Sequence, residues 1–172
     1  VYYYLSRLKG IPRIKDYVGI AGIIFVIFLI SSTYQRISIW KNTDALLNDV
    51  IKKDRTGPAS AQAYYYWGSL NFDRQEYQKA LEQFNHAIEL KPNFAEPYND
   101  RGILMGMAGQ YQEALKDFSK AIENDPDNPE SYYNCGFVFL QLGNSGKACK
   151  DWKKAKELGF KEAENTLKRN CN

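Results

Sequence analysis

Histidine and cysteine are scarce in this sequence of 172 residues, and their scarcity excludes most metal and redox sites. No two of the three cysteines have the Cys-x-x-Cys spacing of zinc and dithiol sites. The single histidine, His86, lies in a predicted helix where no acid or nucleophile has an evident place beside it. We therefore interpret His86 as a surface residue, and we expect no metal, no cofactor and no enzyme activity.

The sequence also lacks a large excess of charge of one sign. Its formal net charge is +3, and residues 58–162 carry more acidic than basic side chains. The positive balance comes from the segments on either side of an apolar stretch near the N-terminus. A domain that binds nucleic acid needs a basic stripe on its folded part, so we expect no nucleic-acid partner.

One stretch has no charged residue at all, and it runs from Tyr17 to Tyr34. As a helix at about 1.5 Å per residue it would span roughly 27 Å, near the thickness of the hydrocarbon core of a bilayer. Tyrosines at both ends are typical of membrane interfaces. We predict a transmembrane helix over 17–34, preceded by a basic juxtamembrane segment over 1–16. A cleaved signal peptide and a buried core helix are the alternatives, and the length of the uncharged stretch argues against both.

The basic residues beside this stretch predict its orientation. Residues 1–16 carry more bases than the segment just after the stretch, which has Arg36 and Lys41. The side richer in Lys and Arg normally stays in the cytoplasm, which would place the folded domain in a periplasm or lumen. The aromatic start of residues 1–5 fits the end of an earlier membrane helix, with a frayed tail as the alternative. Because the first residue is Val, the sequence is either processed or a piece of a longer chain.

Residues 35–57 predict an amphipathic connecting helix. Asn42 or Thr43 would cap its N-terminus, Gly57 and Pro58 would end it, and we expect it to dock on the first hairpin of the folded part. Its apolar residues recur at helical spacing and would form the docking face: Leu46, Leu47, Val50 and Ile51.

Between positions 61 and 162, the same residue types recur every 34 residues. This period predicts helices over 61–74 and 77–90, 95–108 and 111–124, 129–142 and 145–158, followed by a last helix over 161–171. The recurring residues are small, aromatic or proline: Gly68, Gly102, Gly136; Ala80, Ala114, Ala148; Ala87, Ala121, Ala155; Tyr64, Tyr98, Tyr132; Phe84, Phe118, Trp152; and Pro92 and Pro126, with Phe160 in the third place.

This pattern resembles the tetratricopeptide repeat over residues 61–162. The resemblance implies an all-α fold in which three helix hairpins (61–94, 95–128 and 129–162, within 58–160) form a right-handed α-solenoid. A capping helix over 161–172 would close the solenoid, and the transmembrane helix would precede it. Each glycine would let the first helix of a hairpin approach the second, aromatic residues would fill the space between helices, and proline would end each unit. Stacking of the units supplies the core that one unit cannot build alone.

Repeat geometry predicts a concave groove lined by the first helix of each hairpin. An apolar and aromatic lining with a few amides suits a partner protein or an extended peptide. The alternative is that its aromatic residues are partly buried core. The expected lining residues are Tyr65, Ser69, Phe72, Asn99, Ile103, Tyr133, Asn134 and Phe137.

Some tetratricopeptide domains hold a terminal carboxylate with Lys, Arg and Asn at set places. The corresponding residues here are mostly uncharged or acidic, so we do not expect this sequence to clamp a carboxylate: Tyr65, Ser69, Asp100, Glu130 and Asn134, of which only Asn134 fits.

Two functions from different classes are compatible with the sequence. The first is a non-catalytic, membrane-embedded scaffold that binds a partner protein, including as a subunit of a membrane complex. The second follows from the order of a membrane helix, Arg36 and Trp40, a helix and then repeats, which resembles the C-terminus of protein O-mannosyltransferase-like, multi-spanning glycosyltransferases. The catalytic acids of that family lie in early membrane loops that this sequence lacks, so no catalytic residue is carried over.

The last predicted hairpin places two cysteines at the same level. Its turn centres on Gly159 and Phe160, with Cys149 about ten residues before it and Cys171 about eleven after it, and antiparallel helices bring such positions together. We predict a Cys149–Cys171 disulfide, which needs an oxidising compartment. Cys135 is less well placed to form a bridge, and three unpaired thiols are the alternative.

Overall fold

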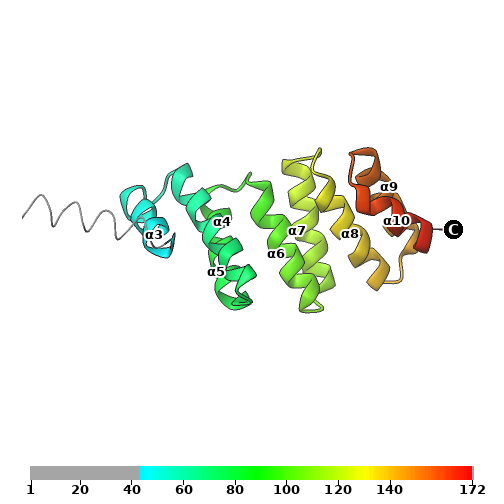
Figure 1. Cartoon of the computed structure of the whole chain (residues 1–172), viewed down its shortest axis with the longest axis horizontal. Coiled ribbons are helices and arrows are strands. Elements are labelled where there is room, and N and C mark those ends of the chain that lie inside the picture. The colour runs from blue at the N-terminus through cyan, green and yellow to red at the C-terminus, as the bar shows by residue number, and fades with distance from the viewer. Residues whose placement is uncertain (1–42, 172) are drawn as a thin grey trace, which may run out of the picture. The chain divides into compact units, whose positions relative to one another are not determined.

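The computed structural model describes residues 43–171, and in this part of the chain it has eight α-helices and no strand (Figure 1). The predicted juxtamembrane segment 1–16 and transmembrane helix 17–34 lie outside the described residues. None of the described helices is long and apolar enough to cross a membrane. The chain divides into two compact units, Val1–Leu46 and Leu47–Asn172. Of the first unit only residues 43–46, at the start of the first described helix, are described, and the rest of the description concerns the second unit.

Six of the helices form three hairpins that follow one another along the chain (Figure 1). From residue 77 onward, each helix begins at the expected residue and ends within one residue of the expected end. The helices are α3 (Thr43–Lys53), α4 (Pro58–Asp73), α5 (Tyr77–Leu90), α6 (Ala95–Met107), α7 (Tyr111–Asn124), α8 (Pro129–Gln141), α9 (Ser145–Glu157) and α10 (Lys161–Asn170).

The structure differs from the prediction around Pro58. In the described residues the connecting helix is α3, which ends at Lys53 rather than at residue 57, and Pro58 begins α4 three residues before the predicted start at 61. Proline suits the first position of a helix because the N–H that it lacks would have no partner there. The dipeptide Gly57-Pro58 is therefore the start signal of the first hairpin as well as the end of the connecting segment.

Each hairpin closes on contact between a glycine and a buried ring. A Cβ atom added at Gly102 would lie 2.9 Å from Cε1 of Phe118, and the corresponding distances to Phe84 from Gly68 and to Trp152 from Gly136 are both 2.5 Å. The three rings are almost fully buried. The glycines therefore recur because each ring occupies the space that a side chain would need.

The turn between the two helices of each hairpin has the same backbone bonds. The N–H of Gly109 donates to the carbonyl of Gly106, and that of Gln110 donates to Met105, which is the Schellman pattern. Gly109 and Gly143 have φ values of +74° and +73°, which glycine adopts without steric cost. Gln75 occupies the same place in the first hairpin with φ +62°, so the turn geometry is retained even where the glycine is not.

Arg101 joins the first two hairpins. Its Nε and Nη2 donate to the two carboxylate oxygens of Asp117 at 2.8 and 2.7 Å, and its Nη1 donates to Oδ1 of Asn85 at 2.6 Å. This bidentate pair raises the pKa of Arg101, mainly through the hydrogen bonds to Asp117. In the third repeat Cys135 and Asp151 take the two places of the pair, so the ion pair is specific to the second repeat.

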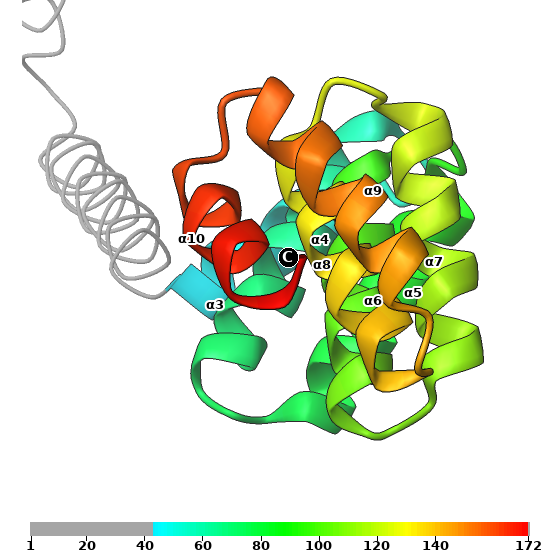
Figure 2. The ribbon, with the colours of Figure 1, turned by 90° about the vertical axis from the view of Figure 1, so that its right-hand side faces the viewer.

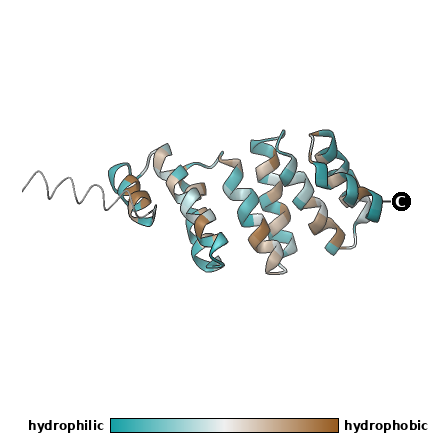
Figure 3. Ribbon diagram, viewed as in Figure 1, coloured by the Kyte–Doolittle hydropathy of each residue, from teal (hydrophilic) through white to brown (hydrophobic). Residues whose placement is uncertain are grey.

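The helix α10 covers the end of the third hairpin by packing on α9 (Figure 2). Ala163 is fully buried, and the Thr166 hydroxyl lies 3.1 Å from the hydroxyl of Tyr133 in α8. The ring of Tyr133 also packs on Phe160, with centroids 4.6 Å apart. Most residues of α9 and α10 are hydrophilic (Figure 3), as expected for helices that end a stack.

Candidate functional site

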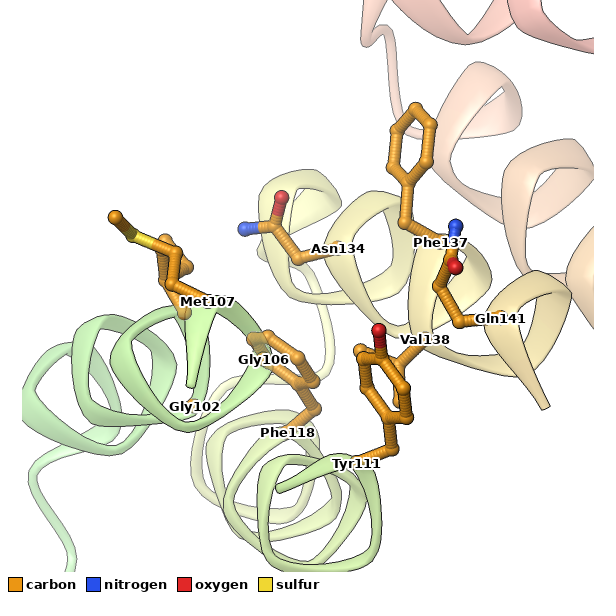
Figure 4. Close-up of a pocket in the computed structure, with 10 residues that line it drawn as sticks. Gly102, Gly106, Met107, Tyr111, Phe118, Asn134, Phe137, Val138 and Gln141 are labelled. Atoms are coloured by element: carbon orange, nitrogen blue, oxygen red, sulfur yellow. The ribbon is translucent and has the colours of Figure 1, made fainter. Parts of the chain in front are cut away.

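A pocket of about 500 Å³ opens between α6 and α8, with α7 beneath it (Figure 4). Its lining is mainly apolar, with two amides and a phenol: Gly102, Ile103, Gly106, Met107, Tyr111, Phe118, Asn134, Phe137, Val138 and Gln141.

The pocket exists because two glycines leave one wall of α6 without side chains. At Gly102 the ring of Phe118 fills the space, whereas at Gly106 an added Cβ would meet only Cγ2 of Val138, at 3.7 Å. That distance is an ordinary van der Waals contact, so the space beside Gly106 is open. Figure 4 shows the rings of Phe118 and Tyr111 rising from α7 between the two flanking helices.

Asn134 is a polar group at the edge of the pocket. Its Nδ2 donates to Oδ1 of Asn99 at 3.3 Å, which leaves its own carbonyl oxygen without a hydrogen bond among the described residues. The amide of Gln141 lies one turn beyond Phe137 on the same helix (Figure 4). An extended peptide presents N–H and C=O groups that two such amides could bind.

The structure brings together three of the eight predicted groove residues, Ile103, Asn134 and Phe137. Phe137 is 39% exposed, and its ring packs edge-on against Trp152 with centroids 5.2 Å apart. Phe137 is therefore held in place by the core while it presents apolar surface to solvent.

The three predicted groove residues in α4 do not line the pocket, and the two aromatic ones pack largely on the core. The ring of Tyr65 packs on those of Phe84 and Phe94, at centroid distances of 6.1 and 5.2 Å. Phe72, like Tyr65, packs against a buried cluster that contains Phe84. The hydroxyl of Ser69 donates to the carbonyl of Tyr65 in its own helix. The alternative interpretation, partly buried core, describes the two aromatic residues better than an open groove does.

Asn99 was expected to be exposed, and the structure corrects this: only 4% of Asn99 is exposed. Its Oδ1 accepts hydrogen bonds from the Ser131 hydroxyl at 3.2 Å and from Asn134. A buried amide must be paired, and here the pairing links α6 to α8. Tyr133 is half-buried beneath α10, where Phe160 and Thr166 contact it, and it does not line the pocket.

An acidic group lies at the N-terminal side of the pocket. Asp100 accepts a hydrogen bond from Nδ2 of Asn99 at 3.2 Å. Burial raises its pKa, and Glu130 and Glu96 raise it further by repulsion. Burial together with the charge of Asp100 raises the pKa of Tyr65 to about 12.

The Cys149 and Cys171 side chains form a disulfide in the structure, with Cα atoms 5.7 Å apart. Cys135 is a buried free thiol. Its pKa is raised, mainly by burial, which disfavours the reactive thiolate. No group of three potential metal ligands occurs within residues 43–171.

Sequence reasoning missed several residues of the pocket wall, of which Tyr111 and Gln141 are the most informative. Tyr77 and Tyr111 are 34 residues apart, so the period marks Tyr111 as a repeated position. Gln141 lies four residues after Phe137, on the same face of the helix. Both signals were present in the sequence, but the lining was expected only from the middle of each first helix.

Comparisons with known proteins agree with this architecture. The model of the TPR repeat family matches residues 68–109 and 107–143. No curated protein matches the sequence. Among solved structures, a crystal structure of MamA is 28% identical, with a TM-score of 0.58, over 77% of this chain and 76% of that chain.

Two further structures share the fold. The first TPR of Spaghetti (RPAP3), bound to the HSP90 peptide SRMEEVD, is 19% identical with a TM-score of 0.63, over 66% of this chain and 92% of that one. The Arabidopsis OM64 TPR domain is 24% identical with a TM-score of 0.63, over 67% and 98%. Residues 68–143 of this chain therefore match the tetratricopeptide repeat model, and the Gly102–Phe118 contact that closes the second hairpin lies within them.

Proposed function

We propose that the chain is a non-catalytic scaffold that binds a partner protein or an extended peptide in the pocket between α6 and α8. Tetratricopeptide repeats serve protein–protein interaction, and the open pocket beside Gly106 is the observation that carries the proposal. Apolar walls with a few polar groups at the rim are typical of peptide-binding sites. Phe137, which the core holds in place while it remains exposed, would be the main anchor.

Filling the pocket tests this proposal directly. A random decapeptide library displayed on phage is panned against the full chain and against a Gly106→Leu variant, in which leucine would occupy the pocket. Binders selected on the unmodified chain should bind the variant at least tenfold more weakly. The matched control is Gly146→Leu, because Gly146 is a helical glycine that faces open space away from the pocket. A library that gives no binder sensitive to Gly106→Leu would refute the proposal.

The location is the second part of the proposal: residues 17–34 anchor the chain in a membrane, with the repeats in a periplasm or lumen. The uncharged stretch and the basic residues before it support this. The chain should remain in the membrane pellet after alkaline carbonate extraction, and deletion of residues 17–34 should release it. An intact chain that carbonate extracts would contradict the anchor. The resemblance to glycosyltransferase tails depends on the predicted membrane helix and on Arg36 and Trp40, all before residue 43, because the helix and repeats that follow suit either alternative.

A further inference from the structure

We infer that the pocket takes a partner segment in which a lysine or arginine lies two to four residues from an apolar side chain. This inference rests on the proposed function and adds the chemical class of the partner. Three features carry it: the order of residues along α6 and α8, the position of Asp100, and the absence of a cation beside Asp100 in the described part of the chain.

Both helices that flank the pocket carry acidic residues near their N-termini and apolar lining residues nearer their C-termini. On α6, Asp100 lies about one turn before Ile103 and about two turns before Met107, so the three share a face. On α8, Glu130 lies one turn before Asn134 and two turns before Phe137. The acids of both helices therefore lie toward the helix N-termini, and the apolar lining lies toward the C-termini. The hydrogen bond from Asn134 to Asn99, the residue next to Asp100, joins the two helices.

Asp100 is a half-buried carboxylate without a counter-ion. No lysine or arginine within residues 43–171 forms an ion pair with it, and its hydrogen bonds come from two neutral groups, the amide of Asn99 and the hydroxyl of Tyr65. Asp117, by contrast, is paired in bidentate fashion with Arg101. A desolvated charge is unfavourable unless it is paired. A lysine or arginine from a partner would form an ion pair with Asp100, as Arg101 does with Asp117.

Helix stability alone does not account for Asp100. Glu96 and Glu130 lie in the first turns of α6 and α8, where the helix dipole stabilises negative charge. Asp100 lies beyond the first turn of α6, where this effect has faded, and both glutamates repel it. The three acids together make this end of the pocket anionic, so it would repel an acidic tail.

The distance along α6 sets the spacing in the partner. From Asp100 to Met107 the helix rises by roughly 10 Å, at about 1.5 Å per residue. An extended chain covers that distance in about three residues. A basic residue at Asp100 would therefore place an apolar side chain, two to four residues away, beside Gly106 and Phe137.

The experiment uses the decapeptide library with the full chain, and it scores the composition of the binders that Gly106→Leu abolishes. These pocket-specific binders should contain Lys or Arg at least about tenfold more often than Asp or Glu at two to four residues from an apolar residue. The Asp100→Asn variant, which keeps the shape of the side chain, should lose this preference. The Asp127→Asn variant removes an exposed acid in a turn away from the pocket and should keep it.

The outcomes separate this inference from the proposed function. Pocket-specific binders that are neutral or acidic would overturn the inference and leave the proposed function standing. If the binders of Asp100→Asn still preferred basic residues, the inference would also be overturned, because a group other than Asp100 would then select the basic residue of the peptide. The absence of any binder sensitive to Gly106→Leu would overturn both.

Discussion

Replacing Gly102 with leucine is expected to unfold the repeats. A Cβ at this position would lie 2.9 Å from the ring of Phe118, which is only 1% exposed. Leucine adds further carbon atoms in the same direction, so α6 and α7 would have to separate. Overpacking a core costs about 1–3 kcal/mol or more, and separation of the helices would also remove the contacts of Phe118. We expect a loss of more than about 3 kcal/mol, measured by thermal unfolding followed by circular dichroism.

The neighbouring glycine supplies the matched control. Gly106 lies one turn later on α6, and its Cβ would make only an ordinary contact with Val138. Gly106→Ala should therefore keep or raise the melting temperature, since alanine favours a helix interior over glycine by roughly 0.5–1 kcal/mol. If Gly102→Leu melted at the same temperature as the unmodified chain, the contact with Phe118 would not be what closes the hairpin.

Loss of the Cys149–Cys171 disulfide is expected to cost about 3 kcal/mol. The bond closes a loop with a sequence separation of 22, and on the chain-entropy model a loop of this size stabilises by about that amount. The loss should fall first on α10, which buries only Ala163 and Thr166. In the double variant Cys149→Ser, Cys171→Ser we expect faster amide hydrogen exchange in α10 than in α6, together with a lower melting temperature.

Thiol counting on the unreduced, denatured chain tests whether the bond exists in the native protein. One free thiol, that of Cys135, is the expected result. The control is a Cys135→Ala variant, in which the count should fall to zero while the bridge persists. Three free thiols in the unmodified chain would contradict the bond, and would remove one support for a periplasmic or lumenal location because disulfides persist in oxidising compartments.

The helix hairpins were predictable from the sequence because their packing is repeated. The same contact between a glycine and an aromatic ring closes each hairpin. The glycines that make it, Gly68, Gly102 and Gly136, are therefore spaced 34 residues apart, and this spacing is visible in the sequence. The start of α4 was less predictable, because the sequence Gly57-Pro58 both ends a preceding segment and begins a helix.

The pocket was only partly predictable, because single side chains at equivalent positions have different surroundings. Asn99, Tyr65 and Tyr133 hold equivalent places, yet each has different partners: Ser131 and Asn134 for Asn99, two phenylalanine rings for Tyr65, and α10 for Tyr133. Repeat geometry gives the position of a residue on its helix, but not which residues of the next hairpin contact it.

The disulfide also determines how the C-terminal end of the stack would respond to mechanical force. A pull on the chain at Cys171 passes across the bond to Cys149 on α9, and bypasses α10. While the bond is intact, the residues between the two cysteines cannot be drawn out, although an open loop of this size would add roughly 70 Å of extended chain. Tension applied at this end would therefore reach the hairpins directly. Whether Cys149 and Cys171 are oxidised to the disulfide would determine how far this end of the chain can be extended.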